Sequence, residues 1–160
     1  MNETLTRDAD VVWVGAVNSV APDVENLLDF LPVLYPGGSS WFATMAAEVE
    51  RGCADAFTAV LDDVTVGVGF GVLKPSNRYK VRTLFVSPSH RGCGVGGALL
   101  TALTARAEEV DADEMFVTAA STIRDEFQPL VCKAGFDLIA TEADRYGVGR
   151  DENIFVRKLP

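Results

Sequence analysis

Residues 86–100 read Val-Ser-Pro-Ser-His-Arg-Gly-Cys-Gly-Val-Gly-Gly-Ala-Leu-Leu. A strand-like run, residues 79–86, leads into this stretch, and a helix-like run, residues 95–110, leads out of it. Glycine has no Cβ, so the chain can turn tightly there and a ligand can approach the backbone. The first N–H groups of a helix have no partner within the helix, and its dipole favours negative charge. A strand, a glycine turn and a helix start together predict an anion site, above all for phosphates.

Three phosphate-binding patterns compete for this stretch. A P-loop requires Gly-Lys-Ser/Thr at the helix start, but Gly96 is followed by Gly97 and Ala98. The dinucleotide fingerprint G-x-G-x-x-G is present as Gly92, Gly94 and Gly97. That fingerprint expects the strand to run directly into the first glycine and an acid about 20 residues further on. Residues 87–91 intervene here, and the next expected strand, residues 115–119, ends without an acid.

The third pattern is a loop for the pyrophosphate of coenzyme A. The stretch resembles motif A of the GNAT superfamily of acyl-CoA N-acyltransferases, whose signature is Arg/Gln-x-x-Gly-x-Gly/Ala after a strand and a proline-containing turn. Residues 91–96, Arg-Gly-Cys-Gly-Val-Gly, match the signature, and residues 86–88 match the lead-in. The order of expected elements also resembles the family from about residue 10 onwards. The competing interpretation is a glycine-rich turn that binds nothing, although four glycines in six residues cost backbone entropy that a plain turn does not require.

The resemblance implies acetyl-CoA as co-substrate and implies no metal. It places the backbone of Leu84, Phe85 and Val86 beside the pantetheine and acetyl group. It places the pyrophosphate on the following turn, where Gly94 and Gly96 would let it approach the backbone. The cofactor-binding residues expected on this turn are Arg91, Gly92, Cys93, Gly94, Val95, Gly96 and Gly97.

The catalytic acid and base are less clear from the resemblance. Many family members carry a Glu on the strand before motif A, but residues 79–86 contain no acid. Many carry a Tyr four residues before the Gly-Phe that closes the later helix, where this chain has Val131. The Asn often found near the start of that helix is replaced by Arg124. We take Tyr146, in a polar loop, as the candidate catalytic residue.

Other polar residues have ordinary structural explanations beside the chemical ones. Asp125 and Glu126 are expected to stabilise a helix dipole, and Thr118 is expected to be a plain strand residue. His90, the only histidine, precedes the loop and is expected at the surface, although its side chain alone titrates near neutrality. Cys93 has no recognisable base partner for nucleophilic chemistry, so we expect it to contribute its backbone.

Composition limits the classes of partner. The chain has 160 residues and a formal charge of −9, which predicts one domain over 1–160 and repulsion of nucleic acid. The acidic surface fits a cationic substrate or a high-salt cytoplasm. No apolar run is long enough for a membrane span, and residues 1–10 do not read as a secretory signal. Three cysteines without metal-ligand spacing suggest free thiols in a reducing cytoplasm.

Two functions fit these observations. The first is a cytoplasmic acetyl-CoA-dependent N-acetyltransferase whose acceptor is a small-molecule or peptide amine, with no nucleic-acid or membrane partner and a homodimer as a possible assembly. The second is a catalytically weak acyl-CoA-binding or regulatory module on the same fold, which the missing acid and base favour.

The periodicity along the chain predicts an α/β (α+β) fold with a mixed sheet, in the order β-α-α-β-β-β-α-β-α-β-β. Residues 1–9 are expected to be frayed, and residues 10–17 to form the first strand. A helix is expected from Pro22, with Leu27, Leu28, Phe30, Leu31 and Leu34 on its apolar face. Ser39 or Ser40 is expected to cap the next helix. Asp62-Asp63 is expected to join two strands, residues 54–61 and 64–73, as a hairpin.

Two features along the chain leave the interpretation open. Gly67, Gly69 and Gly71 alternate, so they leave one face of their strand bare, either for close packing or for a ligand. Pro129 lies within a helix-like run, residues 122–134, so this helix is expected to be short, kinked or late to begin. The last strands are expected over residues 113–120, 136–141 and 153–158, with a polar loop before the final strand.

Overall fold

The computed structural model describes residues 2–7, 10–29, 37–145 and 147–160. Its centre is an eight-stranded sheet in the order β1-β2-β3-β4-β5-β6-β8-β7. Neighbouring strands are antiparallel except β5 and β6, which are parallel. The strands are β1 Asn2–Arg7, β2 Asp10–Val17, β3 Asp55–Leu61, β4 Val64–Leu73, β5 Arg78–Val86, β6 Glu114–Ala120, β7 Asp137–Glu142 and β8 Glu152–Lys158. The prediction of an α/β fold with a mixed sheet is confirmed.

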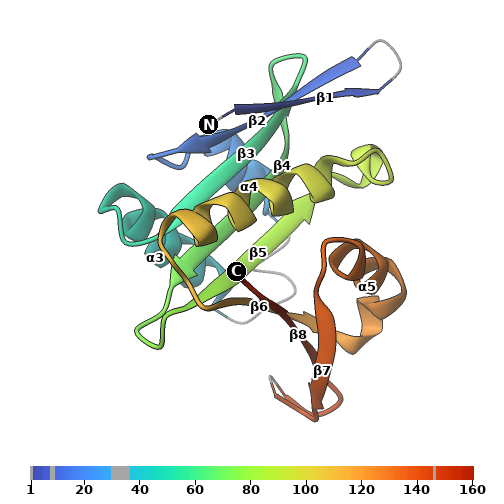
Figure 1. Ribbon diagram of the computed structural model, residues 1–160. Coiled ribbons are helices and arrows are strands. Elements are labelled where there is room, and N and C mark those ends of the chain that lie inside the picture. Colours follow the sequence, from blue (N-terminus) through green and yellow to red (C-terminus); the bar gives the residue numbers. More distant parts are fainter. Residues whose placement is uncertain (1, 8–9, 30–36, 146) are drawn as a thin grey trace.

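Helices cover both faces of this sheet (Figure 1). α4, Val95–Glu109, lies across β3, β4 and β5, and its buried side chains form the larger core cluster with Phe57, Val66 and Phe155. α1, Pro22–Leu27, and α3, Gly38–Glu50, pack on the opposite face around Phe70. α5, Arg124–Lys133, lies beside β7 and β8 (Figure 1). The described helices include no segment long and apolar enough to cross a bilayer.

The hairpin between β3 and β4 forms at the expected residues. Asp62 and Asp63 both have positive φ, 49° and 63°, which is the backbone that a two-residue hairpin turn with the strands' own twist requires. Aspartate tolerates this left-handed conformation better than bulkier residues do. The two acids therefore fix the register in which Leu61 pairs with Val64.

The alternating glycines of β4 serve close packing and leave no room for a ligand. A Cβ built on Gly67 or Gly69 would lie 3.0 Å from side chains of α4, Leu99 in the first case and Leu103 in the second. A Cβ on Gly71 would overlap the ring of Tyr79. Tyr79 is fully buried, and its hydroxyl donates a 2.7 Å hydrogen bond to Asp55. The bare face of β4 thus lets α4 and one tyrosine ring lie directly on the sheet.

The N-terminal part of the fold differs from the expectation. Residues 2–7, expected to be frayed, form the edge strand β1 and pair with β2 from Asn2↔Gly15 to Arg7↔Asp10. An edge strand needs no apolar periodicity, because pairing with its neighbour supplies its backbone hydrogen bonds. The cap of α3 is Gly37, with φ of 80°, and not a serine. The predicted apolar residues Phe30, Leu31 and Leu34 lie outside the described residues.

The helix that contains Pro129 is short. A 3-10 turn, Ser121–Ile123, comes first, and α5 then runs from Arg124 to Lys133 with the proline inside it. Of the three outcomes that the sequence left open, a short helix of 10 residues is observed, and Pro129 lies within it and not at its start. α5 packs against β6 and β7.

Because the space over Gly71 is filled by a buried ring, Gly71→Ala is expected to destabilise the fold by about 2–3 kcal/mol, the usual upper range for overpacking a core. The measurement is the free energy of unfolding from urea titration. Gly69→Ala is the matched control: its methyl meets the end of the Leu103 side chain at 3.0 Å and Leu84 at 3.6 Å, and overlaps neither, so the loss of stability is expected to be smaller. Equal stability of Gly71→Ala and the parent would contradict the packing described here.

Candidate functional site

The two parallel strands at the centre of the sheet separate part-way along their length. β5 and β6 pair from Arg78↔Glu114 to Val81↔Val117 and no further. β5 continues along β4 to Val86, and β6 continues along β8 to Ala120. The backbone edges of residues 82–86 and 118–120 that face each other therefore have no strand partner. Unpaired backbone groups at such a divergence are available to a ligand that lies between the strands.

A bulge marks the point of divergence. Phe70 pairs with Thr83 and Gly71 with Val81, so Arg82 is an extra residue in β5. A bulge bends its strand and increases the local twist. The Arg82 guanidinium turns towards α3, where it donates 2.9 Å from its Nη1 to Oε2 of Glu48. The bulge and this ion pair together direct the second half of β5 away from β6.

The turn after β5 presents a row of unused backbone donors. It consists of a short 3-10 turn, Pro88–His90, followed by residues 91–94 and the start of α4. The first bond of α4 runs from the Ala98 N–H to the Gly94 carbonyl at 3.0 Å. Among the described residues, the amide N–H groups of residues 91–97 donate no hydrogen bond. Several free N–H groups at a helix N-terminus form a site that suits phosphate oxygens.

The glycines of this turn have different structural roles. Gly92 and Gly94 have φ of 75° and 87°, the left-handed region that glycine occupies without strain. Gly96 has no such need: a Cβ there would point at Leu130 of α5, 3.2 Å away. The missing side chain of Gly96 therefore admits α5 against α4, whereas its contact with a pyrophosphate stays a prediction. A Cβ on Gly97 would meet open space.

Arg91 fastens the turn to the end of β5. Its Nε donates a 3.0 Å hydrogen bond to the Val86 carbonyl, and its guanidinium lies 5.4 Å from the ring centre of Phe85. His90, expected at the surface, is half-buried, and Cys93, expected to contribute only its backbone, makes a local hydrogen bond through its side chain. His90 Nδ1 lies 3.1 Å from the Ser89 hydroxyl, and the Cys93 thiol donates to the carbonyl of His90.

The face of the sheet opposite α4 is polar near the divergence. The pairing register places Lys80, Phe116, Thr118 and Glu152 on this face, since Lys80 pairs with Phe116 and Glu152 pairs with Ala120. Glu152 is only 7% exposed. Burial, and after it the positive charges of Arg82, Lys74 and Arg145, lower the pKa of Lys80. Burial also raises the pKa of Glu152, against the opposing charges of Arg145 and Lys80.

Residues 24–136 match the family model described as the acetyltransferase (GNAT) family. The chain belongs to the GNAT family. A search of curated protein sequences gives no significant match.

Solved GNAT structures share this fold at low sequence identity. A GNAT-family protein from Desulfovibrio desulfuricans superposes with a TM-score of 0.76 at 18% identity, over 91% of this chain and 98% of that one. A Bacillus subtilis acetyltransferase in complex with CoA gives a TM-score of 0.71 at 18% identity, over 92% and 98%. An Elizabethkingia anophelis GNAT acetyltransferase with acetyl-CoA bound gives 0.74 at 12% identity, over 92% and 98%.

The positions at which the resemblance expects an acid and a base are filled by other residues here. Val131, at the position where a tyrosine is common, is fully buried in the core. Asp125 and Glu126 are exposed in the first turn of α5, as expected for dipole stabilisation. Thr118 is a half-buried residue of β6. Tyr146, the candidate that the sequence suggested, lies outside the described residues. Sequence reasoning did not single out Glu152, because only the fold shows that this carboxylate is buried.

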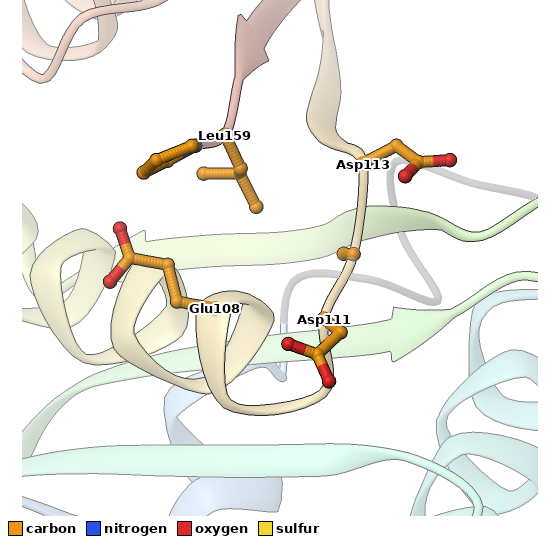
Figure 2. Close-up of a pocket in the computed structure, with 6 residues that line it drawn as sticks. Glu108, Asp111, Asp113 and Leu159 are labelled. Carbon is orange, nitrogen blue, oxygen red and sulfur yellow. The ribbon is translucent and has the colours of Figure 1, made fainter.

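Two hollows elsewhere on the surface do not suit an acyl-CoA. One, of about 370 Å³, lies between the end of α4 and the C-terminal residues and is lined by Glu108, Asp111 and Asp113. Figure 2 shows that these carboxylates point apart, and their charge opposes a phosphate. The other, of about 320 Å³, lies where α4 meets β2 and β3. Its charged lining includes Asp55 and Arg106, which already form an ion pair at 3.1 Å.

The environment of Lys80 predicts how its amine titrates. Because burial and neighbouring positive charge lower its pKa, Lys80 is expected to reach half-maximal labelling by acetic anhydride at a lower pH than the amine of the free model compound Nα-acetyl-lysine amide. Mass spectrometry after pulse labelling across a pH series measures the protein peptide and the model compound in one sample. The two curves are compared by the pH of half-maximal labelling and not by the absolute rate, because burial also slows access of the reagent. Coincident curves for Lys80 and the model compound would contradict the described environment.

Proposed function

We propose that this chain is an acetyl-CoA-dependent N-acetyltransferase that transfers the acetyl group directly from the thioester to an amine. The observation that carries the proposal is the row of free N–H groups at residues 91–97, placed directly after a strand whose edge is open. Family membership supports it, since acetyl transfer from CoA is typical of GNAT proteins. The acceptor we propose is a small-molecule or peptide amine.

The residues present fit an acyl-CoA as substrate. The turn supplies donors for the two phosphates, and open space over Gly92 and Gly97 leaves their backbone accessible. The open edge of β5, at Leu84, Phe85 and Val86, supplies backbone groups alongside which the pantetheine would lie. The thioester is already an activated acyl donor, so the protein has mainly to hold a neutral amine near its carbonyl. The free thiols of Cys53, Cys93 and Cys132 suit a reducing cytoplasm, the location we propose.

A second candidate function is an acyl-CoA-binding or regulatory module with little turnover. Burial of Val131 at the usual tyrosine position, and the lack of an acid along residues 78–86, favour it. Both candidates bind the same ligand, and they differ only in whether acetyl groups leave the thioester for an amine.

Acetyl-CoA at millimolar concentration is expected to raise the melting temperature, because only the folded state carries the site. NADH at the same concentration is expected to raise it much less. A thiol-release assay with pooled amines, amino acids and peptides then measures turnover. Release with at least one pool supports the transferase, whereas binding without release from any pool supports the module. No shift in melting temperature together with no calorimetric binding would exclude both.

Gly94→Ala is expected to weaken acetyl-CoA binding about tenfold or more, equivalent to about 1.4 kcal/mol or above. Alanine at φ of 87° is strained, so the turn would relax and its N–H groups would no longer converge. Calorimetric titration measures the dissociation constant. Gly52→Ala is the matched control, because Gly52 has φ of 74° and open space around its missing Cβ but lies at the end of α3. Both variants are expected to lose similar stability, and only the first to lose affinity; equal affinities would show that the turn does not hold the ligand.

A further inference from the structure

Glu152 is a buried carboxylate without a direct partner. It is the first residue of β8 and only 7% exposed, and no hydrogen bond or ion pair reaches its side chain from the described residues. Burying an unpaired charge costs folding free energy. Violations of this kind are expected mainly at functional sites.

Glu114, on the same pair of strands, is a carboxylate whose hydrogen bonds stabilise the fold, and it serves as a comparison for Glu152. It lies at the other end of the β6–β8 pair, on the same face, since Glu114 pairs with Lys158 and Ala120 with Glu152. Its two oxygens accept from Lys158 Nζ at 2.5 Å and Arg78 Nε at 2.6 Å. These hydrogen bonds, that of Lys158 first, hold the pKa of Glu114 below its ordinary value. Burial raises the pKa of Glu152, so the two carboxylates are perturbed in opposite directions.

The residue after Glu152 carries a buried polar atom without a partner among the described residues. Asn153 is 1% exposed; its Oδ1 accepts from Thr141 at 2.8 Å and Ser121 at 3.3 Å, and its Nδ2 donates to no group of the described residues. A well-packed core leaves few such groups. This amide marks the start of β8 as a place where packing does not satisfy every polar group.

The position of Glu152 relates it to the divergence of the central strands. Its register partner Ala120 lies beyond Val117, where β6 has lost contact with β5. Lys80 of β5 is on the same face and interacts electrostatically with Glu152. The other charged groups around it are Arg145, in the preceding loop, and Glu142 of β7, which pairs with Glu152 in register and forms a 2.6 Å ion pair with Arg145.

We propose that Glu152 is the general base of the reaction, accepting the proton of the acceptor ammonium on the face of the sheet that carries Lys80 and Thr118. This assignment rests on the proposed N-acetyltransferase function and supplies the base that β5 lacks. A base is most effective when its pKa lies near the working pH, and a buried carboxylate is closer to that condition than an exposed one. The acceptor then enters from the side of the sheet opposite α4.

The step balances without a further reactant. The ammonium gives one proton to the Glu152 carboxylate, directly or through one water, and becomes a neutral amine. The amine nitrogen forms a bond to the thioester carbonyl carbon, and the carbon–sulfur bond breaks. The thiolate leaves with the electron pair of that bond, and the second proton lost by the nitrogen passes to the thiolate, directly or through water. The products are an amide, the free thiol and one proton, which Glu152 returns to the solvent.

The test compares Glu152→Gln with Glu114→Gln in the full chain, using an acceptor that the thiol-release assay identifies. Glu152→Gln is expected to lower kcat about a hundredfold or more, within the usual range for a lost general base, while the dissociation constant for acetyl-CoA stays unchanged. The acidic limb of the pH profile of kcat/KM is expected to disappear. Glu152→Asp, which keeps a carboxylate, is expected to retain that limb. Glu114→Gln is expected to keep the parent's kcat and profile.

Stability gives a readout that does not depend on activity. The carboxylate with the raised pKa weakens folding above that pKa, and its cost vanishes below the ordinary pKa, where both states are protonated. Glu152→Gln is therefore expected to unfold at equal or higher urea concentration than the parent at pH 8. Glu114→Gln is expected to unfold at lower urea at pH 8, and to approach the parent as the pH falls.

Two results would overturn the assignment alone, and a third would overturn it together with the proposed function. A Glu152→Gln protein with the parent's kcat and pH profile would remove Glu152 from the chemistry while the transferase function stands. A variant that loses kcat in parallel with acetyl-CoA affinity and stability would make Glu152 a structural residue. A parent chain that binds acetyl-CoA but acetylates no amine would instead overturn the proposed function, and this assignment with it.

Discussion

Most of this structure depends on one constraint, the short length of the parallel pairing between β5 and β6. The two strands share hydrogen bonds over four residue pairs, Arg78↔Glu114 to Val81↔Val117, and then follow different neighbours. Arg82 supplies the extra residue that bends β5, and its ion pair with Glu48 ties the bulge to α3. A fully paired sheet would satisfy these backbone groups internally. The early separation leaves them without a strand partner in the described sheet.

The close fit of α4 over β4 holds this opening in place. Gly67 and Gly69 bring the helix directly onto the sheet, and Gly96 brings α5 against α4. The start of α4, with its free N–H groups, is thereby fixed next to the end of β5. Arg91 adds a hydrogen bond from the turn to the Val86 carbonyl. The turn with its free N–H groups and the open strand edge are thus held next to each other by packing, and fixed positions of this kind favour the orientation of two reactants.

The charged residues divide into those that stabilise the fold and those that do not. Glu114, Glu48 and Asp55 each accept hydrogen bonds from an arginine. Glu152 is more buried than these three, and no arginine of the described residues donates a hydrogen bond to it. Its position fits this difference, because β5 has separated from β6 before the level of Glu152.

The sequence by itself determined the central motif and much of the topology. Four glycines after a strand, with Arg91 before them, indicated the turn and the family, and Asp62-Asp63 indicated the hairpin, because left-handed backbone strongly restricts residue choice. Tertiary structure alone decided the other features. The strand β1 forms because it pairs with β2, and composition does not encode that pairing. The sequence also does not show why β4 and position 96 carry glycine, because the reason lies in the side chains that pack on them. The burial of Glu152 depends on β6, β7 and β8 meeting from distant parts of the chain, and no local pattern reports the environment that such contacts create.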